Sequence, residues 1–228
     1  MTKESFLGVD GCKEGWVGVA LNTNGRFQES ILVDKFSDLT KYFPNVEIIG
    51  VDMPVDLVNK PSRMADQLVR KKLGSKRGRS VFPAIPKFMI ERKWIDMKAD
   101  ELNKESRRRL GCAFSRQTIN LKNKILEVNQ LLSPSLNIIE VHPELCFMKM
   151  NSELPLEYSK KTWNGMQQRL KLLEENGIYL PSNLGPINGL VSPDDVIDAA
   201  AVAWTIKRFH AGHAISYPDD SNSPQIWV

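Results

Sequence analysis

Short apolar runs separated by turn residues dominate the first third of the chain and predict strands. Residues 5–9 and 16–21 are apolar and flank a glycine-containing turn. A turn signal at residues 22–25 precedes a third apolar run at 30–33. We therefore expect the chain to begin with a three-stranded antiparallel meander.

A fourth apolar run, residues 47–52, follows a short helix expected at residues 37–43 and ends in Asp52. A strand reached through a crossover helix pairs in parallel with its neighbour in the sheet. Asp10 ends the first strand in the same way. One such aspartate is as easily explained as a turn cap. Two aspartates at the ends of neighbouring strands instead indicate that both belong to one functional site.

Helical periodicity takes over after residue 60, and helices are predicted at residues 62–73, 87–109, 115–132, 163–176 and 192–204. The length of 228 residues suits one domain with a substantial core. We expect a single α/β domain over residues 1–228, in which a mixed central sheet carries helices on both faces. Residues 60–124 would form a basic, mainly helical insertion within that domain.

A further acid-bearing strand is predicted at residues 137–144. Strand alternation places Glu140, His142 and Glu144 on one face, and the sequence does not decide which of them lies in a site. A single histidine is more often structural than catalytic. Acidic neighbours two residues away on either side nevertheless make His142 a candidate.

The helix at residues 192–204 has Ser192 as a good N-cap and Pro193 in its first turn. Asp195 and Asp198 are three residues apart and therefore share one helix face. Acidity in a first turn is partly explained by the helix dipole. Asp198 is less easily explained in this way, because a run of alanines suited to close packing follows it directly.

Composition and cysteine usage favour an ordinary cytoplasmic protein with no membrane partner. Hydrophobic residues make up 42% of the chain and charged residues 25%. No apolar run approaches the roughly 18 residues of a membrane span, and no signal-peptide core precedes the first strand. The three cysteines are far apart, which argues against a disulfide framework or a zinc ribbon.

The net charge of +4 hides a strong asymmetry, because residues 60–124 hold 19 of the 31 lysines and arginines. Such a run is most often a solvated helix face, but its size also suits an anionic polymer. No aromatic-rich stretch of the kind that stacks single-stranded bases accompanies it. The candidates for contacting nucleic-acid phosphates are Arg70, Lys71, Lys72, Lys76, Arg77, Arg79, Lys160 and Lys161.

Carboxylates that converge from several elements repel one another unless a cation joins them. Oxygen ligands with few His or Cys favour Mg²⁺ or Mn²⁺ over zinc, and two such ions can bracket a phosphodiester. The metal-ligand candidates are Asp10, Asp52, Asp195 and Asp198. The wider catalytic set adds Glu140 and His142.

The order of elements and the placing of the acids resemble the ribonuclease H-like fold, whose catalytic acids lie on the first strand, the fourth strand and a C-terminal helix. From Gly8 to about residue 218 the chain resembles the family called domain of unknown function 429. That resemblance implies a predicted nuclease of ribonuclease H-like fold. The motifs that carry it are residues 8–16, 50–54, 79–84, 140–144, 159–162 and 194–199.

The sequence predicts a metal-dependent nuclease and leaves two alternatives open. The turn at Asp10 loosely fits the first phosphate loop of actin-like and sugar-kinase-like phosphotransferases or ATPases, although no second glycine-rich loop follows. A non-catalytic nucleic-acid-binding protein of the same fold is the other alternative. The oligomeric state also stays open, and a homodimer is among the options.

Overall fold

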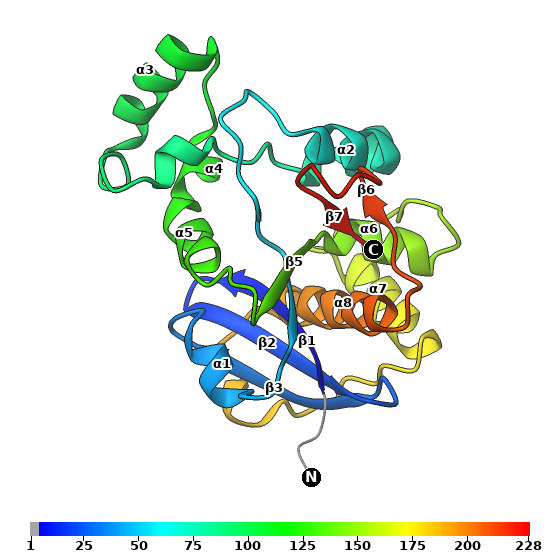
Figure 1. The fold of residues 1–228 in the computed structure, drawn as a ribbon. Coiled ribbons are helices and arrows are strands. Elements are labelled where there is room, and N and C mark those ends of the chain that lie inside the picture. The colour runs from blue at the N-terminus through cyan, green and yellow to red at the C-terminus, as the bar shows by residue number, and fades with distance from the viewer. Residues whose placement is uncertain (1–4) are drawn as a thin grey trace.

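A mixed seven-stranded sheet crosses the part of the chain that this computed structural model describes, residues 5–228 (Figure 1). The order of the strands across the sheet is β3-β2-β1-β4-β5-β7-β6. Their bounds are β1 Ser5–Cys12, β2 Gly15–Asn22, β3 Phe27–Val33, β4 Ile48–Val51, β5 Asn137–Val141, β6 Ser216–Tyr217 and β7 Ile226–Trp227.

The pairing of the strands confirms the predicted meander and crossover. Strand β2 lies antiparallel between β1 and β3, and β4 pairs in parallel with β1, with Val51 opposite Val9. The Asp52 N–H donates a hydrogen bond to the Val9 carbonyl at 3.0 Å, which extends the pairing by one step. Asp10 and Asp52 therefore emerge side by side at the same edge of the sheet.

The described residues form eight α-helices: α1 Asp38–Tyr42, α2 Met64–Arg77, α3 Ala99–Leu110, α4 Arg116–Asn120, α5 Lys122–Gln130, α6 Pro143–Met150, α7 Trp163–Glu175 and α8 Pro193–His210. The helix predicted from residue 87 begins only at Ala99, after a 3₁₀ helix over Lys87–Ile90 and several turns. The helix predicted for residues 115–132 is divided at Leu121. None of the helices in residues 5–228 combines the length and hydropathy of a membrane span.

The sequence does not predict helix α6 and strand β7, which both lie in the C-terminal half of the chain. Strand β5 ends at Val141, because Pro143 opens helix α6, so Glu144 lies on a helix and not on the strand. Helix α6 is buried along most of its length and shows no polar face, which removes the periodic signal. Strand β7 is two residues long and pairs in parallel with β5.

Helices cover both faces of the sheet and form two hydrophobic cores. Helices α2, α6, α7 and α8 pack against side chains such as Val17 and Val19 of β2. Helix α1 and helices α3 to α5 pack with Leu7, Val9 and Trp16 on the other face. The predicted insertion, residues 60–124, thus contributes α2 to one core and α3 and α4 to the other. In Figure 1, α3 and α4 accordingly stand apart from α2.

Helix α8 lies unusually close to the sheet, because Gly8 on β1 has no side chain. A Cβ atom at Gly8 would lie 2.1 Å from the Ala203 backbone nitrogen and 2.2 Å from the Ala199 carbonyl oxygen. Real Cβ atoms do not approach backbone atoms so closely. The contact also determines where the aspartates meet, since Asp198 precedes Ala199 and Asp10 lies two residues beyond Gly8.

We predict that Gly8→Ala lowers the free energy of unfolding by about 3 kcal/mol or more, because α8 must move away from β1. Gly18→Ala is the matched control on β2, where the new Cβ would meet only side-chain atoms at 3.2 to 3.4 Å. Urea denaturation of both variants measures the difference. Equal destabilisation by the two substitutions would contradict this account of the packing.

Candidate metal centre

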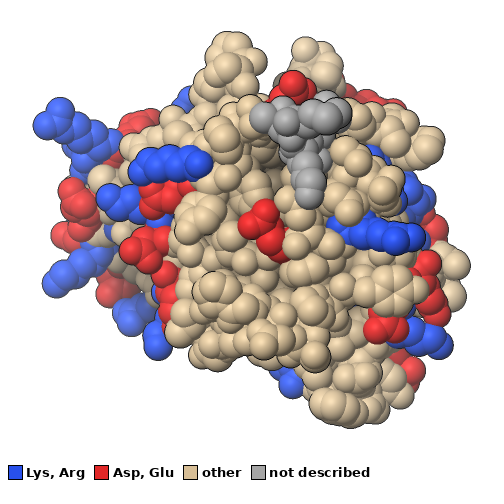
Figure 2. Space-filling model, turned by 90° about the horizontal axis from the view of Figure 1, so that it is seen from below, with Lys and Arg blue, Asp and Glu red and all other residues tan. Residues whose placement is uncertain are grey.

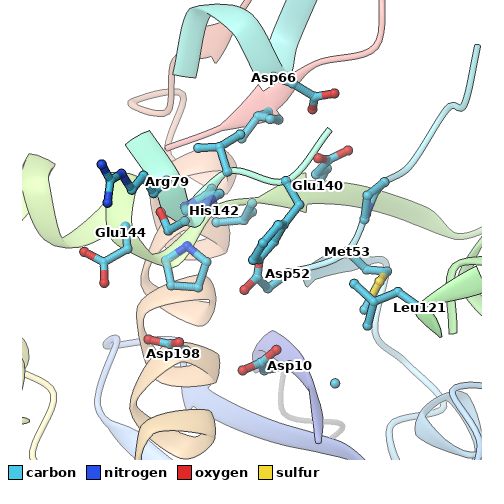
Figure 3. A pocket seen from close by; sticks show the side chains of 18 of the residues that line it. Asp10, Asp52, Met53, Asp66, Arg79, Leu121, Glu140, His142, Glu144 and Asp198 are labelled. Atoms are coloured by element: carbon cyan, nitrogen blue, oxygen red, sulfur yellow. The ribbon is translucent and has the colours of Figure 1, made fainter. Parts of the chain in front are cut away.

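Three aspartates from three separate elements converge at the carboxyl edge of the sheet (Figure 3). Asp10 lies on β1, Asp52 directly follows β4, and Asp198 lies in the second turn of α8. Each offers one carboxylate oxygen, and the three atoms lie within 4.8 Å of one another. Within residues 5–228 they form the only such cluster of three or more His, Cys, Asp or Glu side chains. The cluster could hold a metal ion.

Burial and mutual repulsion make the carboxylates of this triad difficult to ionise. Asp10 is 7% exposed and Asp198 is 2% exposed. Burial, together with the charges of Asp52 and Asp198, raises the pKa of Asp10 well above its usual value. Burial raises the pKa of Asp52 to about 6 and that of Asp198 to about 7, although the nearby Lys160 opposes both shifts.

Lys160 is the resident cation of the triad. Its ammonium group forms an ion pair with Asp198 and lies 3.5 Å from an oxygen of Asp194. Burial disfavours the charged lysine, but the pKa of Lys160 is raised because Asp198 and Asp10 attract its proton more strongly. A single lysine therefore faces three buried carboxylates, which leaves an unbalanced negative charge for a bound cation.

The other acids at the start of α8 are placed differently. Asp194 accepts hydrogen bonds from Lys161, at 2.6 Å, and from the Ser192 hydroxyl, so it is already paired. Asp195 lines the same cleft as the triad but is only half-buried. The structure thus brings Asp198 into the triad and leaves Asp195 beside it.

Glu140 faces a separate ion network. The Arg63 guanidinium donates to both carboxylate oxygens of Glu140 at 2.7 Å and to Asp66 at 2.6 Å. The Val55 N–H donates to Glu140 at 2.8 Å. Both oxygens of Glu140 are therefore bound within the protein, and Figure 3 shows the carboxylate turned towards Asp66, apart from the triad.

His142 and Glu144 line the same cleft as the triad. Glu144 forms an ion pair with the buried Arg169. Burial lowers the pKa of His142, although the negative charges of Glu144 and Asp198 oppose the shift. Its Nδ1 atom is buried and has no hydrogen-bond partner among the described residues. His142 is thus a neutral imidazole beside the triad with an unused nitrogen.

The triad lies at the bottom of a cleft of about 590 Å³. One wall is formed by the segment around Met53 and by Leu121 and Ile125 near α5. The opposite wall is the segment from Lys76 to Ala84. The cleft is therefore enclosed by parts of the chain that lie far apart in the sequence.

The candidate phosphate contacts divide into bonded and available side chains. Arg70 donates to the Val81 carbonyl, Arg77 donates to the carbonyls of residues 156 and 157, and Lys72 pairs with Glu153. Lys71 is exposed outside the cleft. Lys160 and Lys161 line the cleft and pair with Asp198 and Asp194, so only Lys76 and Arg79 line it as available cations.

Basic and acidic residues are mixed on the face of the molecule that is seen from below. Figure 2 shows the molecule from below, where lysines, arginines and acids alternate around the rim of a largely uncharged surface. That face therefore shows no continuous basic patch.

Sequence reasoning missed two features of this centre. The sequence predicts Lys160 only as a phosphate contact. It gives no sign of the ion pair with Asp198, because the two residues are 38 positions apart in the chain. The pairing of Arg63 with Glu140 spans 77 residues and was equally hidden. The one local signal for the Arg63–Glu140 pairing is the spacing of Arg63 and Asp66, which suits an ion pair on a helix. In the sequence, however, Arg63 reads as one more basic residue of segment 60–124.

Comparisons with known proteins give one result. Searches of curated proteins and of solved structures returned no match. A family model described as protein of unknown function (DUF429) matches residues 8–223, which include all three aspartates of the triad. The match spans nearly the whole chain, and the protein therefore belongs to the DUF429 family.

Proposed function

We propose that this protein is a divalent-metal-dependent nuclease of ribonuclease H-like fold. The observation that carries the proposal is the meeting of Asp10, Asp52 and Asp198, within 4.8 Å, at the bottom of a cleft lined with basic residues. Clustered carboxylates beside available cations suit a substrate that carries phosphates and a reaction that requires metal ions.

The topology supports the fold assignment. The strand order β3-β2-β1-β4-β5 contains an antiparallel meander followed by parallel strands, as the ribonuclease H-like resemblance implies. The three aspartates come from the first strand, the end of the fourth strand and the last long helix. These are the positions of the catalytic acids in that fold.

The donor set fits Mg²⁺ or Mn²⁺. All three ligands are hard carboxylate oxygens, and no cysteine or histidine belongs to the cluster. Oxygens bound to one Mg²⁺ lie at most about 4.2 Å apart, twice a bond of about 2.1 Å. The triad is already close to this spacing. Bound metal ions would activate water and stabilise the leaving oxygen of a phosphodiester.

The surrounding side chains suit positioning of the substrate. Strand β1 contacts both β4 and α8, so Asp10 would be the central ligand, while Asp195 lines the same cleft and is available to a second ion. Lys76, Arg79 and Lys161 would bind phosphate oxygens. His142, neutral and with a free Nδ1, would orient water or the leaving group. Glu140 would hold Arg63 and the segment at Val55 in place and take no part in the chemistry.

We predict that Asp10→Asn abolishes cleavage of nucleic acid in Mg²⁺ or Mn²⁺. In the absence of metal the same variant should melt at a higher temperature than the wild type, because one of three repelling carboxylates is gone. Asp38→Asn, on α1, is the control and should keep the activity and the rise in melting temperature on adding Mn²⁺. Equal cleavage by Asp10→Asn and wild type would refute the mechanism.

Lys160→Met should increase the affinity for Mn²⁺ by about tenfold, because the resident cation no longer competes for Asp198. Without metal the variant should be less stable than the wild type, since the triad loses its counter-ion. Lys161→Met removes an adjacent lysine that pairs only with Asp194 and should change neither quantity strongly. Titration calorimetry and thermal melts measure both. Weaker Mn²⁺ binding by Lys160→Met would contradict the competition.

The metal-free protein should gain stability from the triad as the pH falls. Asp52 and Asp198 titrate near pH 6 and 7 in the folded protein and near 3.9 in an unfolded chain. Between about pH 4 and 7 the folded state therefore binds more protons, so the contribution of these groups falls as the pH rises. Urea denaturation from pH 5 to 8 should show this slope, and Asp198→Asn should reduce it. An unchanged slope in that variant would contradict the shifts.

A further inference from the structure

We propose that the cleft receives an unpaired nucleotide, so that the substrate is single-stranded nucleic acid and not a continuous duplex. The inference deepens the proposed nuclease function and rests on it for the chemistry. It adds the class of substrate, which the triad alone does not specify.

The depth of the triad is the first reason. Asp198 and Asp10 are almost completely buried, so a scissile phosphate must enter the cleft to reach them. The cleft volume of about 590 Å³ lies in the range of small-molecule sites. Duplex-binding proteins instead spread their contacts over roughly 1,000 to 2,500 Å² of surface. A stiff duplex cannot bend into such a space, whereas an unpaired strand can turn its backbone and bases inwards.

The apolar lining is the second reason. Met53, Leu121 and Ile125 line one side of the cleft, and Phe82 and Pro83 line the other. Phe82 is 42% exposed although it is a large hydrophobic residue. An exposed aromatic ring at a phosphate-binding cleft is the arrangement on which unpaired bases stack. In a duplex the bases are already stacked on each other and would leave this surface uncovered.

The basic side chains that line the cleft are the third reason. The side chains of Lys76 and Arg79 line the cleft and make no ion pair or hydrogen bond within the described residues. Lys161 lines it as well; its ammonium group pairs with Asp194, and its side chain is 68% exposed. These cations lie on the same segments as the exposed aromatic rings, so a backbone that they bind would bring its bases within reach of those rings.

Two further exposed aromatic residues lie beside these lysines in the sequence, although they are not among the residues that line the cleft. Tyr158 and Trp163 bracket the cleft-lining residues 159–161 and are 41% and 70% exposed. Aromatic rings close to basic side chains are the combination that binds single strands without sequence preference. Phe82, Tyr158 and Trp163 together thus offer stacking surfaces to successive bases along a strand that leaves the cleft.

Fluorescence anisotropy in EDTA tests this inference without any cleavage. The probes are fluorescein-labelled single strands of 12 nucleotides, as DNA and as RNA, and the corresponding blunt duplexes. We expect the wild type to bind a single strand at least tenfold more tightly than its duplex. Phe82→Ala and Trp163→Ala should each weaken single-strand binding by about tenfold, since stacking contributes about 1–3 kcal/mol per base. Tyr42→Ala removes an aromatic side chain on α1 that is 65% exposed; it is the control and should bind as the wild type does.

The outcomes separate this inference from the proposed function. Duplex binding equal to or tighter than single-strand binding would overturn the inference, and so would unchanged affinity in both aromatic variants. Failure of every probe to bind would also overturn it. Preferential single-strand binding without cleavage in Mg²⁺ or Mn²⁺ would support the inference and reject the nuclease. Cleavage of duplexes alone would support the nuclease and reject the inference.

Discussion

The close contact between α8 and β1 is the constraint on which the candidate site depends. Gly8 leaves room for the backbone of α8 at Ala199 and Ala203, and no other residue type would fit there. The helix consequently presents Asp198 to Asp10, two residues further along the same strand. A helix held one side-chain layer further out would separate the carboxylates and leave β1 and β4 with only two of the three. The packing of small residues thus creates the charge cluster.

Two sets of buried charges lie near each other and differ in how well they are balanced. Arg63 binds Glu140 and Asp66 through several short hydrogen bonds, and the network is closed by backbone N–H groups of Val55 and Ala84. Charges paired in this way fix the geometry of the cleft around Glu140 and Asp66. Asp10, Asp52 and Asp198 have one lysine among them, and burial, together with repulsion between carboxylates, raises their pKa values. An uncompensated buried cluster is costly to the fold, which is the usual mark of a functional site.

The basic middle of the chain serves several purposes at once. Arg70 and Arg77 bind backbone carbonyls and hold together the segments that form the cleft wall, whereas Arg79 and Lys76 are left for a ligand. Charge counting along the sequence cannot separate these roles, because each depends on which carbonyl or carboxylate lies within reach. The resident lysine, Lys160, comes from outside the basic segment altogether.

The sequence by itself determined the meander, the parallel crossover to β4 and the placing of Asp10 and Asp52 at adjacent strand ends, because these follow from local apolar runs and glycine turns. It also indicated the last helix and its two acids. Only the tertiary structure decided that Asp198 and not Asp195 joins the triad, since that choice depends on the approach of α8 to Gly8. Long-range contacts likewise decided that Glu140 faces Arg63, that Lys160 faces Asp198, and that the exposed Phe82 lines the same cleft as the triad. Such pairings join residues tens of positions apart, and no local pattern in the chain records them.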